Sequence, residues 1–131
     1  MANSMATHRK RPVNLNLLQL TLQLPIGGVV SIIHRATGAL LVLLIPYALY
    51  ALQTSLESPM RFEQIRVSLA SGVGRIALLL ALWVVVQHLY SGIRHLFMDI
   101  DVGVDLTAAR RSAWLTLAAS VITVALLGVL L

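Results

Sequence analysis

The chain has 131 residues and a formal net charge of +5, and its composition is 58% hydrophobic and only 11% charged. Because a soluble domain carries about 25% charged residues to keep its surface wet, this composition predicts an integral membrane protein. The length leaves no room for a separate catalytic domain beside a membrane module. The lack of cysteine excludes disulfides and iron–sulfur ligation within this sequence.

Residues 1–25 are predicted to form a cytoplasmic tail followed by an interfacial segment. The first dozen residues are basic and polar. No short apolar core with a small-residue cleavage site follows them, so removal of a signal peptide is not expected. Residues 13–24 alternate between apolar and polar types over their second half, which is typical of an extended or interfacial stretch.

Three uncharged runs predict three transmembrane helices in an all-α fold. Pro25 suits the start of a helix, where no amide donor is needed. Residues 36–56 then contain no charge over 21 positions, which is enough for a hydrocarbon core that takes ~20 residues to cross. The expected spans cover residues 26–52, 72–97 and 112–131. The first is closed by Ser-Leu-Glu-Ser-Pro, and a polar connection at 57–71 separates it from the second.

The distribution of basic residues predicts the orientation. The tail and the second loop carry five of them, whereas the first loop carries three, at positions 61, 66 and 75. Basic residues favour the cytoplasmic side. The amino terminus is therefore expected inside and the carboxyl terminus outside. Because the charges do not gather in one patch, no nucleic-acid partner is expected.

Two of the predicted helices carry matching polar stripes. Each stripe has members at offsets 0, 3, 4 and 7, which fall on one helical face. The first stripe is Ser31, His34, Arg35 and Gly38, and the second is His88, Ser91, Gly92 and His95. Since the two helices run in opposite directions, the stripes are expected to meet at similar depth, toward the cytoplasmic side.

This pattern suits a b-type haem and a quinone. Haem needs an axial imidazole, for which His88 is the candidate, and a small residue beside the macrocycle, for which Gly92 is the candidate. Arg35 and His34 can meet the propionates. Ser31 and Arg35 can donate hydrogen bonds to quinone carbonyl oxygens.

Plainer interpretations remain open. The histidines can be hydrogen-bonded packing residues, and the glycines can simply allow close helix contact. Arg35 and Arg94 can extend to lipid headgroups. Three hydroxyl residues on the third helix are interpreted as packing residues: Thr116, Ser120 and Thr123.

Two segments carry a resemblance to the cytochrome b subunit of succinate dehydrogenase. The first comprises Arg11-Pro12-Val13-Asn14-Leu15, Leu24-Pro25-Ile26 and Ser31-Ile-Ile-His-Arg-Ala-Thr-Gly38. The second, residues 88–99, matches that family's H-x-x-x-G-x-R-H-L-x-x-D motif. The resemblance extends over nearly the whole chain.

The resemblance implies one of two membrane anchors, each contributing half of a helical bundle, in a four-subunit complex of a bacterial cytoplasmic membrane. A flavoprotein subunit oxidises succinate, an iron–sulfur subunit carries electrons, and the anchors reduce ubiquinone. His88 is then an axial ligand of a haem b shared with the other anchor, while His34, Arg35 and His95 serve the propionates. Ser31 and Arg35 match quinone-site residues, and Asp99 matches the terminal acid of the motif, with a possible part in proton delivery.

The second axial ligand is expected from the partner anchor. His88 and His95 project from one helix and approach from the same side, so they cannot sandwich one iron. His34 is the remaining candidate, but Arg35 beside it suits the edge of the macrocycle. Two alternatives to the whole assignment are the anchor of a fumarate reductase and a haem-free helical scaffold or proton-conducting subunit.

Overall fold

The computed structural model describes residues 24–130, which form four α-helices and no strand. These are α2 (Ile26–Glu57), α3 (Pro59–Ala70), α4 (Gly72–Asp99) and α5 (Leu106–Leu130). Helices α2, α4 and α5 are each long and apolar enough to cross a membrane, so the predicted all-α protein with three spans is confirmed. The tail predicted for residues 1–25 lies almost entirely outside the described residues.

Helix α2 begins at the predicted residue but ends later than expected. Pro25 is extended, with φ −61° and ψ 147°, and its carbonyl accepts a 2.7 Å hydrogen bond from the Gly28 amide. The helix then continues to Glu57 instead of residue 52. Ser58 cannot follow, because a residue before proline is forced out of the helical conformation, and it is extended with φ −164°. The helix therefore starts where the proline predicts and is five residues longer than predicted.

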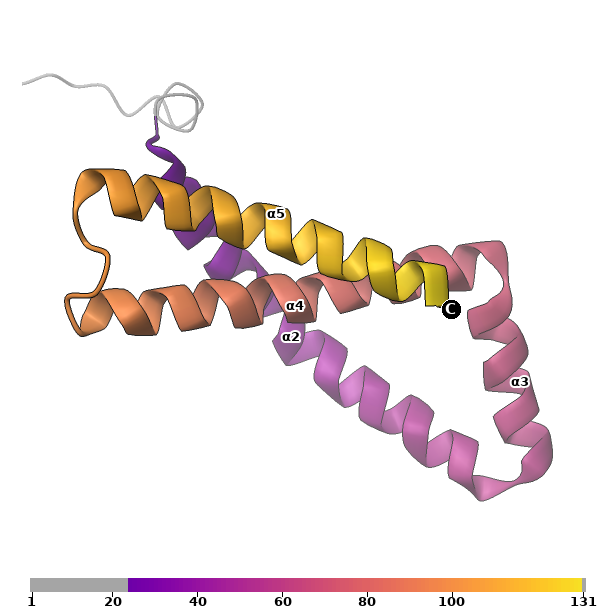
Figure 1. Ribbon diagram of the computed structural model, residues 1–131. Helices are drawn as coiled ribbons and strands as arrows, with labels where there is room; N and C mark the ends of the chain where they lie inside the picture. Colours follow the sequence, from indigo (N-terminus) through magenta and orange to yellow (C-terminus); the bar gives the residue numbers. More distant parts are fainter. Residues whose placement is uncertain (1–23, 131) are drawn as a thin grey trace, which may run out of the picture.

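The segment expected as a polar connection is the helix α3. The Ser58 hydroxyl accepts a 3.2 Å hydrogen bond from the Arg61 amide, and Pro59 occupies the first turn. Glu63 accepts hydrogen bonds from Arg66, and these lower the pKa of the Glu63 carboxyl. Both side chains are exposed, so the pair contributes little to stability. As Figure 1 shows, α3 joins the distant ends of α2 and α4.

Helix α5 starts six residues before the predicted position 112. Asp105 explains the difference, because its carboxylate accepts hydrogen bonds from the amides of Thr107 (3.0 Å) and Ala108 (3.1 Å). Such capping satisfies amides that the first turn leaves without partners. The preceding loop reverses the chain through Asp101 and Gly103, which have φ values of 61° and 73°.

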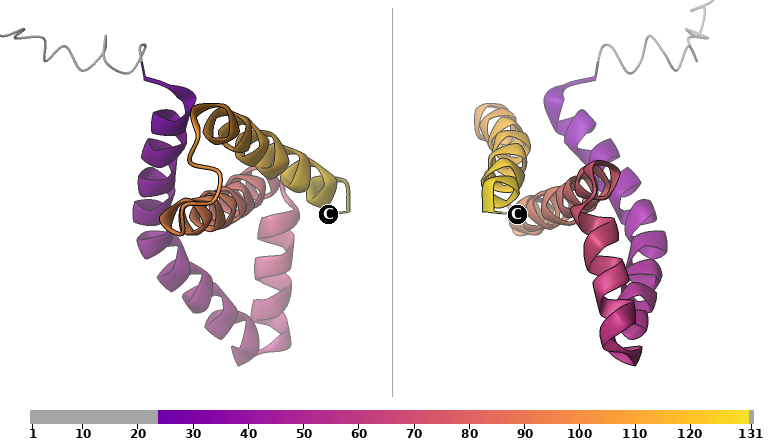
Figure 2. Two further views of the ribbon diagram at one scale, coloured as in Figure 1. Left: turned by 60° about the vertical axis from the view of Figure 1, so that its left-hand side comes forward. Right: turned by 90° about the vertical axis from the view of Figure 1, so that its right-hand side faces the viewer.

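Helix α4 is the centre of the arrangement and contacts all three other helices. Helix α5 runs back along it, whereas α2 crosses it at a steep angle and then diverges toward α3 (Figures 1 and 2). The diverging half of α2 exposes large apolar side chains such as Leu43, Tyr47 and Leu56, at 73%, 69% and 77%. In a membrane protein these surfaces face lipid or another subunit.

The interior of the three-helix unit is unusually polar. The buried apolar residues are Val30, Val84, Ala113 and Val124. The buried polar or charged residues are Thr37, Gln87, Ser91, Arg94, Thr116 and Ser120. No hydrophobic force drives helices together within lipid, so small residues and interhelical hydrogen bonds hold them. The helix contacts thus carry the polar groups, and these define the candidate site.

Candidate functional site

Three histidines come together where α2 crosses α4. The rings of His34 and His88 stack with centroids 4.2 Å apart and planes inclined by 11°. The His95 ring adjoins that of His34, with the centroids 5.1 Å apart and the planes inclined by 54°. The prediction that the two polar stripes meet at similar depth is therefore confirmed for their histidines.

The His88 ring is held by the backbone and by one side chain of α2. Its Nδ1 lies 3.1 Å from the carbonyl oxygen of His34 and 3.2 Å from the Thr37 hydroxyl. A carbonyl can only accept, and the Thr37 hydroxyl has carbonyl acceptors of its own at Ile33 (2.8 Å) and His34 (3.0 Å). This network assigns the proton to Nδ1. Nε2 then keeps a free lone pair, which is the form of imidazole that binds a metal.

Two glycines make the close approach of these rings possible. A Cβ atom at Gly38 would lie 3.0 Å from Cε1 of His88, and one at Gly92 would lie 3.4 Å from Nε2 of His34. The first distance is tighter than ordinary van der Waals contact. The glycines therefore admit histidine side chains from the opposite helix. A contact between Gly92 and a macrocycle stays a prediction.

Within the described residues, no hydrogen bond joins the remaining predicted site residues to this cluster. Ser31 is half-buried, whereas Arg35 and Asp99 are exposed. Within residues 24–130, no hydrogen bond or ion pair reaches the side chains of these three residues. The exposed side chains of Arg35, in the first half of α2, and of Asp99, at the end of α4, are therefore open to groups outside the three-helix unit.

Ser91 does not belong with the stripe to which the sequence assigned it. Its hydroxyl accepts a 2.8 Å hydrogen bond from the side-chain amide of Gln87, whose oxygen accepts a 2.5 Å bond from Ser120 of α5. Gln87, Ser91 and Ser120 are all fully buried. Ser91 therefore lies with Gln87 on the face of α4 that contacts α5, whereas His88, Gly92 and His95 lie on the face that contacts α2. The packing interpretation of Thr116 and Ser120 agrees with their burial.

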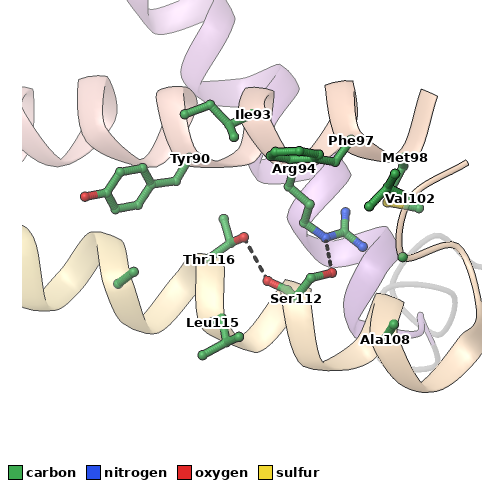
Figure 3. Close-up of a pocket in the computed structure, with 12 residues that line it drawn as sticks. Tyr90, Ile93, Arg94, Phe97, Met98, Val102, Ala108, Ser112, Leu115 and Thr116 are labelled. Atoms are coloured by element: carbon green, nitrogen blue, oxygen red, sulfur yellow. Dashed lines mark hydrogen bonds between the residues drawn. The ribbon is translucent and has the colours of Figure 1, made fainter. Parts of the chain in front are cut away.

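Arg94 is a buried cation whose position the sequence did not predict. It is only 7% exposed, and its Nε donates to the Ser112 hydroxyl at 3.0 Å while Nη2 donates to the Ala109 carbonyl at 3.1 Å. As Figure 3 shows, the guanidinium group turns from α4 toward α5. Arg94 lines a hollow of about 560 Å³ there. The suggestion that Arg94 extends to lipid headgroups is therefore wrong. Only its place one residue before His95 in the motif hinted at a role.

Replacing Gln87 by leucine is expected to weaken the contact between α4 and α5. The change removes one buried hydrogen bond within α4, to Ser91, and one between helices, from Ser120. The Ser91 hydroxyl loses its donor, whereas the Ser120 hydroxyl can still donate to the Leu117 carbonyl at 2.9 Å. Interhelical hydrogen bonds in membranes are worth about 0.6–1.7 kcal/mol. Unfolding in detergent, titrated with sodium dodecyl sulfate, should show a loss of this size. Gln64→Leu on the exposed face of α3 is the control, and an equal loss in both variants would contradict the assignment.

Comparisons with known proteins identify the family of this chain. The family described as succinate dehydrogenase/fumarate reductase transmembrane subunit matches residues 7–127. A succinate dehydrogenase cytochrome b556 subunit from Coxiella burnetii (strain RSA 493 / Nine Mile phase I) is 34% identical over 121 residues, covering 92% of this chain and 95% of that protein. The subunit of the same name from Paracoccus denitrificans is 33% identical over 100 residues, covering 76% and 77%. One from Rickettsia bellii (strain RML369-C) is 31% identical over 125 residues, covering 93% and 94%. The chain, with its three membrane-spanning helices, belongs to the family of succinate dehydrogenase/fumarate reductase transmembrane subunits.

Proposed function

We propose that this chain is the cytochrome b anchor of a succinate dehydrogenase. In this proposal His88 is an axial ligand of haem b, and Ser31 and Arg35 form part of the ubiquinone-reduction site. The observation that carries the haem assignment is the contact of His88 Nδ1 with the His34 carbonyl and the Thr37 hydroxyl, because it leaves Nε2 for iron. Relatives named cytochrome b556 subunits support the presence of a haem b.

The residues around His88 fit the acidic edge of a haem. The His34 ring stacks on that of His88 and the His95 ring adjoins that of His34, and both can donate hydrogen bonds to propionates. Arg35 follows His34 directly, is exposed, and has no acidic partner among residues 24–130. Its guanidinium group can therefore bind a carboxylate through charge-assisted hydrogen bonds. When bound, haem b supplies a one-electron redox centre within the bilayer.

The second axial ligand comes from another subunit in this proposal. Two imidazoles that bind one iron must approach it from opposite faces of the macrocycle. His34 instead stacks almost parallel on the face of His88, with ring centroids 4.2 Å apart. His95 follows His88 on the same helix. A second membrane anchor therefore provides the other imidazole and completes a two-subunit bundle around haem, and lipid surrounds that bundle.

Ser31 and Arg35 lie one turn apart on α2 and would donate hydrogen bonds to a quinone carbonyl oxygen. Full reduction of a quinone takes two electrons and two protons, so the site needs donors that stabilise developing negative charge. The electrons arrive from succinate through the flavoprotein and iron–sulfur subunits. Asp99, exposed at the end of α4, is in position to carry protons from the aqueous side.

The proposed location is the inner membrane of a bacterium, with the amino terminus in the cytoplasm and the carboxyl terminus in the periplasm. The excess of basic residues in the tail and in the loop that ends at Arg110 and Arg111 supports this orientation. It places Ser31, Arg35 and Asp99 toward the cytoplasmic side, where the iron–sulfur subunit would dock.

The test is to identify what co-purifies with the tagged chain at native expression levels, together with an absorption spectrum. We expect a second helical anchor, an iron–sulfur subunit, a flavoprotein and a haem Soret band. The chain should be unstable alone, because a charge such as that of Arg35 costs about 2.5–3.5 kcal/mol when it faces the bilayer centre. A stable monomer in mild detergent, without partners and without haem absorption, would refute the proposal and favour a haem-free scaffold.

A further inference from the structure

The contact between His88 and α2 includes one side chain, that of Thr37, whose own effect on the histidine can be argued further. Thr37 is only 2% exposed, and its Oγ1 lies 3.2 Å from His88 Nδ1. The ring N–H is therefore shared between two oxygen atoms, one from the Thr37 hydroxyl and one from the His34 carbonyl at 3.1 Å. A ring held by two acceptors has less rotational freedom than a ring held by one.

The hydroxyl of Thr37 is itself fixed in direction. Its proton is directed at the carbonyls of Ile33 and His34, at 2.8 and 3.0 Å, as is common for threonine in helices. A lone pair of Oγ1 is consequently left for His88. Because the residue is buried, solvent has little access to replace this oxygen if it is removed.

Gly38 limits the position of the same ring at the neighbouring atom. A Cβ atom there would lie 3.0 Å from Cε1 of His88, so the imidazole fills the space that glycine leaves. The adjacent residues Thr37 and Gly38 thus act on adjacent atoms of one ring, Nδ1 and Cε1. Together they constrain both its tautomer and the orientation of its plane.

We infer that Thr37 is a positioning residue for His88: its hydroxyl and the space at Gly38 hold the imidazole in the tautomer and orientation that present Nε2 to haem iron. This inference rests on the proposed role of His88 as a haem ligand. Partners of this kind orient metal-binding histidines and raise their basicity, and their loss typically costs about 10–100-fold in metal affinity or activity. A more basic imidazole favours ferric over ferrous iron, so Thr37 should lower the midpoint potential of the haem.

The alternative is that Thr37 only packs α2 against α4, and the chain offers a matched control for it. Thr116 of α5 is 9% exposed and donates to the Ser112 carbonyl at 2.8 Å. It therefore resembles Thr37 in burial and in its bond within the helix, but no hydrogen bond joins it to a histidine in the described part of the chain. Thr37→Val and Thr116→Val remove the same hydroxyl from similar surroundings.

The experiment compares Thr37→Val, Thr37→Ser and Thr116→Val in the complete purified complex. For Thr37→Val we expect a higher midpoint potential, altered g values of the ferric low-spin haem in electron paramagnetic resonance, and haem transfer to a scavenger protein about tenfold faster. Thr37→Ser keeps the hydroxyl and should restore all three properties. Thr116→Val should match the wild type.

Identical behaviour of Thr37→Val and Thr116→Val would overturn the inference, as would a failure of serine to restore the spectrum. If Thr37→Val does not assemble, Thr37→Ala is the second hydroxyl-free variant, with the same expected shifts. Loss of assembly in both, with Thr116→Val intact, would assign Thr37 to packing alone and also overturn it. Absence of haem from the wild-type complex would instead refute the proposed function, so the two failures are distinguishable.

Discussion

Replacing His88 by alanine is expected to remove most of the haem b from the assembled complex and to abolish the low-spin, six-coordinate spectrum of what remains. The reason is that Nδ1 of His88 is hydrogen-bonded to α2, with the His34 carbonyl oxygen at 3.1 Å and the Thr37 hydroxyl at 3.2 Å. Its Nε2 is then ready to bind a metal without a change of tautomer. The haem content per flavin, measured after extraction, should fall at least about tenfold.

His34→Ala is the matched test within the same cluster. The His34 ring stacks on that of His88, with the centroids 4.2 Å apart. Its removal should weaken the binding of the haem propionates and shift the midpoint potential of the haem, while the haem stays six-coordinate. A five-coordinate, high-spin haem in His34→Ala would show that both axial ligands lie in this chain, contrary to the proposed partner ligand.

The spans were predictable because they depend on composition along the chain. A run of about 20 uncharged residues has few alternatives to crossing a bilayer, and all three such runs became long helices. Helix α3 was missed although its start carries a recognisable signal. Ser58 followed by Pro59 is a typical N-cap and first helical residue. However, no residue of the segment is buried, and its apolar residues do not gather on one face of the helix, so the usual periodic signal is absent.

The candidate site was predictable only as far as spacing along one helix allows. Residues at offsets of three, four and seven share a face, which placed His34 and His88 correctly. Spacing does not say where one face ends and the next begins. Ser91 therefore appeared to belong with His88, although it bonds to Gln87 toward α5. The bonds of Arg94 to Ser112 and of Thr37 to His88 depend on how the helices cross, and a single sequence does not contain the crossing angle.

Removal of either proposed donor to quinone is expected to slow quinone reduction by an order of magnitude or more. The loss of a hydrogen bond from a charged group costs about 1.5–3 kcal/mol, and each 1.36 kcal/mol is tenfold in rate. Arg35→Ala should therefore have the larger effect, and Ser31→Ala the smaller. The stability of the protein should be little changed, because no described residue bonds to either side chain and Arg35 is exposed.

Two assays on the same complex separate a role at quinone from a structural one. Reduction of a ubiquinone analogue requires the membrane site, whereas oxidation of succinate with an artificial dye can bypass it. Ser31→Ala and Arg35→Ala should reduce only the first activity. Ser55→Ala, near the far end of α2, and Arg61→Ala, exposed on α3, are the matched controls and should change neither. If both activities fell equally in Arg35→Ala, its guanidinium group would be holding the complex together, and the quinone assignment would be wrong.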